Sequence, residues 1–68
     1  MRSQIQLGKN IKKARQKAEM TQAEVSLKAG IHVNYFARIE RGEENPSIDI
    51  IEKISRALKV KSSEILPF

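Results

Sequence analysis

The sequence predicts an all-α fold, a single compact domain over residues 1–68 built as a bundle of five helices. Apolar residues recur at spacings of three and four, the periodicity of one helix face, and β-branched residues do not alternate with polar ones. Only three glycines and two prolines interrupt the pattern. A chain of 68 residues allows one small core, and without cysteines no disulfide can stabilise it. Helix packing, with or without a partner subunit, must therefore hold the fold together.

The first predicted helix covers about residues 4–18. Four apolar residues fall on one face at steps of four, three and four: Leu7, Ile11, Ala14 and Ala18. Gly8 weakens its first turn. Residues 1–17 hold six basic and no acidic side chains, in a chain of net charge +5. This excess indicates a polyanionic partner, nucleic acid first, although a charged helix can also serve solubility alone.

The second predicted helix begins after Thr21, whose hydroxyl can cap the free amides of the first turn. Glu24, three residues on, can bond back to the Thr21 amide, which completes a capping box. The helix extends to about Lys28, and Gly30 follows at the position that favours left-handed backbone.

The third predicted helix spans about residues 33–41 and ends before Gly42. Two short helices joined through a tight turn at Gly30 form a helix-turn-helix over about residues 21–41. After a loop at 43–46, Ser47 caps a fourth helix, whose inner face carries three apolar residues: Ile51, Ile54 and Leu58. A short fifth helix is expected over residues 62–66, where Pro67 stops it.

The outer face of the third helix has the side chains that base recognition needs. At about 100° per residue, Phe36 and Ile39 define the inward direction. The opposite side carries an amide, a methyl and two guanidinium groups: Asn34, Ala37, Arg38 and Arg41. Asparagine and arginine bond adenine and guanine edges in bidentate fashion, and Val33 can touch a thymine methyl. A polar outer face alone is ordinary, but the tight turn and the basic charge favour DNA recognition.

Four short motifs together resemble one known family. They are TQAEV at 21–25, AGI at 29–31, YFARIERG at 35–42 and NPS at 45–47. The sequence resembles the phage repressor and Cro type of helix-turn-helix regulators, also called the xenobiotic-response-element family. The resemblance implies a five-helix domain that binds double-stranded operator DNA as a homodimer and regulates transcription. Residues 35–41 are also similar to the controller proteins of restriction–modification systems.

The resemblance also implies roles by position. Base contacts are expected from Val33, Asn34 and Arg38. Contacts to the DNA backbone are expected from Gln22, Tyr35, Arg41 and Asn45. Gln22 is also a candidate brace for the third helix, and Tyr35 stands where relatives contact either the backbone or a base. Arg15 and Glu40 match a structural salt bridge between the first and third helices, although charge alone would make Arg15 a phosphate contact. We favour the salt bridge, because an unpaired Glu40 beside DNA would repel phosphate.

Some positions depart from the family pattern. His32 stands where a better capping residue is usual. A looser start of the third helix and a contact between the imidazole and phosphate are two interpretations, but we favour a partly exposed turn residue. Glu43 and Glu44 occupy a loop where relatives often offer basic residues, which weakens the case for phosphate contacts there. Lys61 stands where a cap for the fifth helix is usual.

Other classes of function have less support. A single histidine with no cysteine argues against a metal site or catalysis, and no cofactor motif or small-molecule site is evident. Without a long apolar run or a signal-peptide pattern, we expect no membrane contact and a cytoplasmic location at the nucleoid. The main alternative is a protein-interaction module, such as an antitoxin or adaptor. The apolar groups of Ile65, Leu66 and Phe68 are candidates for a dimer interface, with closure of the core as the alternative.

Overall fold

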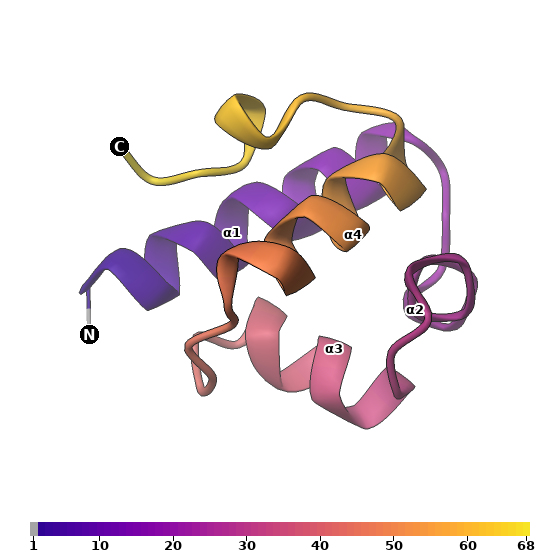
Figure 1. Cartoon of the computed structure of the whole chain (residues 1–68), viewed down its shortest axis with the longest axis horizontal. Coiled ribbons are helices and arrows are strands. Elements are labelled where there is room, and N and C mark those ends of the chain that lie inside the picture. The colour runs from indigo at the N-terminus through magenta and orange to yellow at the C-terminus, as the bar shows by residue number, and fades with distance from the viewer. Residues whose placement is uncertain (1) are drawn as a thin grey trace.

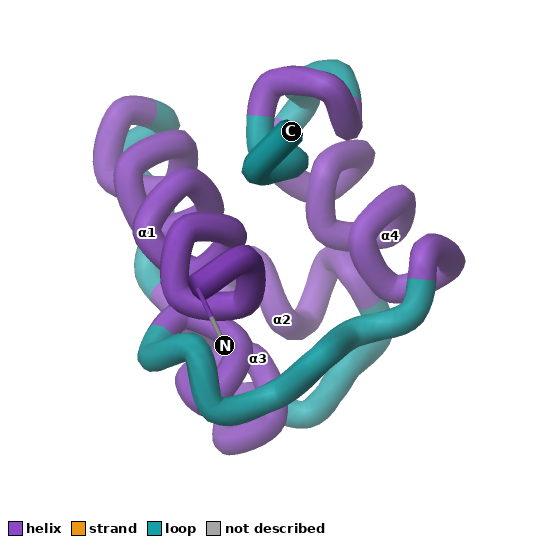
Figure 2. The backbone as a smooth tube through the Cα atoms, turned by 90° about the vertical axis from the view of Figure 1, so that its left-hand side faces the viewer, coloured by secondary structure: helices purple, strands orange, loops and turns teal. Residues whose placement is uncertain are grey.

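The computed structural model describes residues 2–68 and confirms the all-α prediction, since no strand occurs within that range. Its elements are α1 (Arg2–Lys17), α2 (Gln22–Ala29), α3 (Val33–Glu40), α4 (Ile48–Leu58) and a 3-10 turn (Ser62–Glu64) (Figure 1). α2 packs against α3 and α4, while α1 packs against α3. Figure 2 shows α2 and α3 below the other two helices, with the loop before α4 crossing in front.

Every helix contributes to a single core. Six side chains are essentially inaccessible to solvent, namely Ile11, Val25, Phe36, Ile39, Ile54 and Ile65. Each such side chain stabilises the fold by about 1.5–3 kcal/mol relative to its exposed state. The last of them shows that the C-terminal segment closes the core, and this buried position removes Ile65 from the candidate dimer interface.

The turn between α2 and α3 follows the sequence prediction closely. The Glu24 amide donates to the Thr21 hydroxyl at 3.0 Å, and the Thr21 amide donates to the Glu24 carboxylate at 2.8 Å. Gly30 adopts φ 72°, in the left-handed region, and the next amide donates to the Ser26 carbonyl at 3.0 Å. These bonds satisfy both ends of α2 and fix where α3 begins.

α1 lies very close to the end of α3 at Gly8. A Cβ atom added at Gly8 would lie 2.5 Å from the carbonyl oxygens of Ile39 and Glu40. Gly8 is therefore more than a weak point in the first turn, because the absence of a side chain lets α3 lie directly against α1.

Two sequence expectations about the elements are wrong. Residues 2–68 form four α-helices, not five, because the segment after Lys61 makes only a 3-10 turn. Lys61 provides no side-chain cap, and Pro67 lacks the amide that a longer helix would need. Ala18 is exposed and not buried in the core, and it follows the last residue of α1, Lys17. Nowhere in this part of the chain is a helix both long and apolar enough to cross a membrane.

Candidate nucleic-acid interface

The outer face of α3 is accessible from solvent. Phe36 and Ile39 are buried behind it, as the helical periodicity predicts. Val33, Asn34 and Arg41 are exposed, while Tyr35 and Arg38 are half-buried. The three residues expected to contact bases therefore share a surface that the rest of the described chain does not cover.

The first turn of α3 is capped by its histidine. The ring Nδ1 of His32 accepts a hydrogen bond from the Asn34 amide at 3.0 Å. The expectation of a poorly capped, looser start is therefore wrong, because this bond satisfies one of the free amides that a helix start leaves. It also fixes the backbone next to Val33 and Asn34.

A partly buried network joins α1, α2 and α3. The Nε and Nη2 atoms of Arg15 donate to the two carboxylate oxygens of Glu40, at 2.7 and 3.1 Å. Arg15 also donates to the Met20 carbonyl at 3.0 Å, and the Gln22 side-chain amide donates to Glu40 at 2.9 Å. Only 3% of the Glu40 side chain is exposed, so the carboxylate depends on these donors.

Arg15 and Gln22 both have a structural role, because each donates hydrogen bonds to the buried Glu40 carboxylate. Hydrogen bonding to Glu40 raises the pKa of the Arg15 guanidinium above its ordinary value. Arg15 and Glu40 are the pair that the family resemblance implies, and Gln22 is a third member that the sequence spacing does not disclose. Because Gln22 starts α2 and Glu40 ends α3, the network fixes the angle between the two helices of the motif.

The loop after α3 brings two carboxylates back onto its arginines. The Nε of Arg38 donates to Glu44 at 2.9 Å, and the Tyr35 ring lies near the same guanidinium, 6.0 Å from the ring centre to its central carbon. The Nε and Nη2 of Arg41 donate to the two oxygens of Glu43, at 3.0 and 3.2 Å. Their hydrogen bonds raise the pKa of Arg41 and lower that of Glu43. Glu44 and Glu43 thus bind the two arginines that were predicted to contact DNA, and the sequence alone did not predict these pairs.

Asn45 follows the two carboxylates in the loop between α3 and α4. It is exposed, and Pro46 next to it is buried. Pro46 therefore anchors the loop to the rest of the domain directly beside Asn45, a predicted contact to the DNA backbone.

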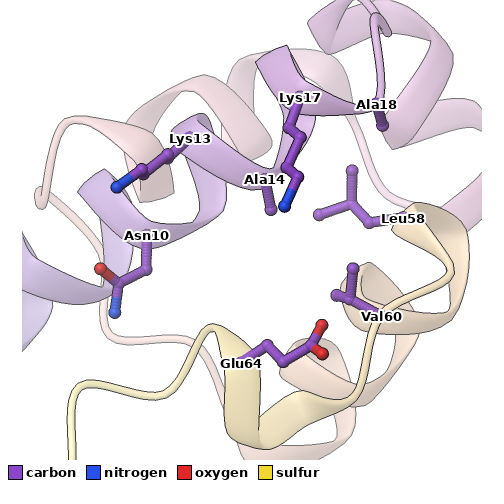
Figure 3. A pocket seen from close by; sticks show the side chains of 8 residues that line it. All are labelled: Asn10, Lys13, Ala14, Lys17, Ala18, Leu58, Val60 and Glu64. Atoms are coloured by element: carbon purple, nitrogen blue, oxygen red, sulfur yellow. The ribbon is translucent and has the colours of Figure 1, made fainter.

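A second surface feature lies away from the motif. An open groove of about 590 Å³ runs between α1, the end of α4 and the 3-10 turn (Figure 3). Its walls mix amine, carboxylate, amide and apolar groups, supplied by Asn10, Lys13, Ala14, Lys17, Ala18, Leu58, Val60 and Glu64. No lining residue belongs to α2 or α3, so the groove is separate from the candidate interface. Residues 2–68 also bring together no group of three or more possible metal ligands from His, Cys, Asp and Glu.

Comparison with known proteins places this geometry among DNA-binding regulators. Residues 11–65 match the helix-turn-helix family profile. The control protein C.BamHI of Bacillus amyloliquefaciens is 42% identical over 52 residues, which cover 76% of this chain and 64% of that protein. The immunity repressor of Bacillus phage phi105 is 35% identical over 60 residues, covering 88% of this chain and 42% of the repressor. The chain thus spans less than two thirds of either relative.

A solved structure shares the whole fold. The restriction–modification controller protein C.AhdI of Aeromonas hydrophila superposes with a TM-score of 0.94, covering 97% of this chain and 100% of that one. Its sequence identity is 23%, so this likeness concerns the arrangement of the helices. The predicted resemblance to phage repressors and to restriction–modification controllers is confirmed by these matches.

Proposed function

The chain belongs to the helix-turn-helix family of transcriptional regulators, and from this premise we propose that it recognises a specific double-stranded operator with α3 in the major groove. The observation that carries the proposal is the accessible face of α3, held from behind by Phe36 and Ile39. A recognition helix must project its side chains from a fixed backbone, and the two helix caps and the Glu40 network supply that rigidity.

We assign base contacts to Val33 and Asn34, at the exposed start of α3, and to half-buried Arg38 in its last turn. A side-chain amide and a guanidinium are the donors that read adenine and guanine, and a valine methyl suits thymine. Such contacts specify sequence, whereas contacts to phosphate set the register of the protein on the duplex.

We assign phosphate contacts to Gln22, Tyr35, Arg41 and Asn45. Gln22 occupies the first turn of α2, where helix amides and the helix dipole attract anions. Its side-chain amide carries two hydrogens, and the bond to Glu40 uses one of them. We assign the second hydrogen of the Gln22 amide to a phosphate oxygen of the DNA.

We further propose that the chain acts as a homodimer on a pseudo-palindromic operator. One α3 supplies three or four base contacts worth about 1–3 kcal/mol each, which is little against a genome of competing sites. A two-fold dimer doubles the site and sets its halves about 34 Å apart. Phe68 and Ile48, whose exposed fractions are 92% and 64%, line the same surface hollow and are our candidates for the interface.

These assignments imply a regulator without catalytic activity or cofactor. A protein that binds operator DNA acts where the DNA is, so we place it in the cytoplasm at the nucleoid. The exposed lysines of α1 would add attraction to DNA that does not depend on sequence.

Selection of bound sequences from a random duplex pool, at two salt concentrations, tests the proposal. We expect a palindromic consensus whose affinity falls as salt rises, because bound phosphates release counterions. Arg38→Ala should relax preference at one position in each half-site. Arg56→Ala, which removes an equal charge from the exposed side of α4, is the matched control and should leave the consensus unchanged. Failure of the wild-type chain to enrich any sequence at either salt would refute the proposal and favour the interaction-module alternative.

A further inference from the structure

Arg38 is bound by the protein along only one edge of its guanidinium. Its Nε donates to the Glu44 carboxylate at 2.9 Å, and this is the hydrogen bond that its side chain makes within residues 2–68. The two terminal nitrogens, Nη1 and Nη2, retain their hydrogens for another acceptor. About 42% of the Arg38 side chain is exposed, so that acceptor can come from outside the protein.

The remaining edge matches one base. Guanine presents two adjacent acceptors, O6 and N7, in the major groove, and a guanidinium binds them with two parallel donors. A bond at Nε leaves the terminal pair of donors intact. Because the guanidinium is planar, that bond also restricts the plane in which the pair lies. The Tyr35 ring, 6.0 Å away, further limits the space open to the group.

Arg41 forms a different kind of pair. It donates from both Nε and Nη2 to Glu43, so one hydrogen of a terminal nitrogen is occupied, whereas Arg38 keeps all four hydrogens of Nη1 and Nη2. Both side chains are more than half exposed, and such surface pairs contribute little to stability or order. Glu43 therefore occupies one terminal nitrogen of Arg41, whereas Glu44 occupies neither terminal nitrogen of Arg38.

We propose that Glu44 is a specificity-determining positioning residue, which orients Arg38 so that its terminal nitrogens face one guanine while Glu44 itself does not touch DNA. This inference rests on the proposed function. Fixing a long side chain during binding lowers affinity about two- to tenfold, and here the fixing precedes binding. The negative charge of Glu44 meanwhile repels phosphate on every sequence. The carboxylate therefore lowers general affinity and raises preference for one base.

The test measures affinity for the selected operator and for duplexes altered at single positions. The position that Arg38→Ala affects is identified first. Glu44→Gln and Glu44→Ala should lower the preference for guanine there about two- to tenfold, with other positions unchanged. They should also raise affinity for unrelated duplexes. The double variant Arg38→Ala with Glu44→Ala should discriminate no less than Arg38→Ala alone, because Glu44 acts through Arg38.

Glu43→Gln is the matched control, since it removes the same charge one residue away. It should raise affinity for all duplexes and leave the preferred base unchanged. The inference is overturned if the Glu44 variants keep full preference at that guanine, or if they merely strengthen binding to all sequences alike. Melting temperatures of all variants show whether a lost preference reflects a damaged fold. A wild-type chain that selects no sequence overturns the proposed function as well, whereas a retained guanine preference overturns only the role of Glu44.

Discussion

Replacing Gly8 by alanine sets two physical effects against each other. Alanine favours a helix over glycine by about 1 kcal/mol, so helix propensity alone predicts a more stable protein. The added Cβ, however, would lie 2.5 Å from two backbone carbonyl oxygens of α3, where ordinary contacts begin at 3.4 Å. To restore an ordinary contact, α1 and α3 must separate by about 0.9 Å, the difference between those two distances. A side chain could rotate away, but the backbone of a packed helix cannot.

Overpacking of this kind costs about 1–3 kcal/mol, and three backbone atoms within 3.0 Å place Gly8→Ala at the upper end. After the gain in propensity, we expect a net loss of about 1–2 kcal/mol. That is a large share of the roughly 3–10 kcal/mol available to a domain of this size. The melting temperature should fall by about 5–15 °C.

Urea and thermal unfolding followed by circular dichroism measure this loss. The neighbouring exposed position supplies the control, since Lys9→Gly and Lys9→Ala give the propensity difference without any contact to α3. Operator affinity of Gly8→Ala should fall more than affinity for unrelated duplexes, because α3 is displaced. A Gly8→Ala protein that melts at a higher temperature than the wild type would refute the reasoning and leave helix propensity as the deciding effect.

Three further predictions concern the network and the caps. Arg15→Ala leaves the Glu40 carboxylate buried without its main partner, so unfolding in urea should show a loss of about 3–5 kcal/mol, and unchanged stability would exclude the structural role. Gln22→Ala should weaken binding to all duplexes alike in titrations, and an altered consensus would contradict a phosphate contact. The hydrogen bond from the Thr21 amide lowers the pKa of Glu24 below its ordinary value. The ionised Glu24 therefore stabilises the fold above that ordinary value, and this stabilisation is lost as pH falls through the lower folded-state pKa. Unfolding between pH 6 and 3 should therefore depend less on pH in Glu24→Gln, and an identical profile would count against the capping box.

Local features of the motif were predictable because they depend on neighbours in the sequence. The capping box at Thr21 and Glu24 joins residues three apart, and the left-handed turn at Gly30 needs only a missing side chain. The inward direction of Phe36 and Ile39 follows from helical periodicity. The predicted fifth helix was wrong for a local reason too. The segment after Lys61 is short and has no side-chain cap, and so it forms only a 3-10 turn.

Other features depend on contacts that no local spacing encodes. Gln22 meets Glu40 across 18 residues, and Gly8 meets the same end of α3 across more than 30. Glu44 reaches Arg38 because Gly42, at φ 78°, turns the chain back along the helix it has just left. From the sequence, Glu43 and Glu44 only weaken the case for phosphate contacts in this loop, whereas the folded chain places Glu44 on Arg38, the arginine to which we assign a base contact.

The sequence by itself determined where α2, α3 and α4 begin, which side of α3 faces inward and which chemical groups face outward, since hydrogen bonds and periodicity along one helix decide these. Only the tertiary structure decided how closely α1 approaches α3 and which carboxylate holds which arginine. Those outcomes depend on the relative positions of separate helices and on the direction of long side chains, which packing of the whole domain fixes.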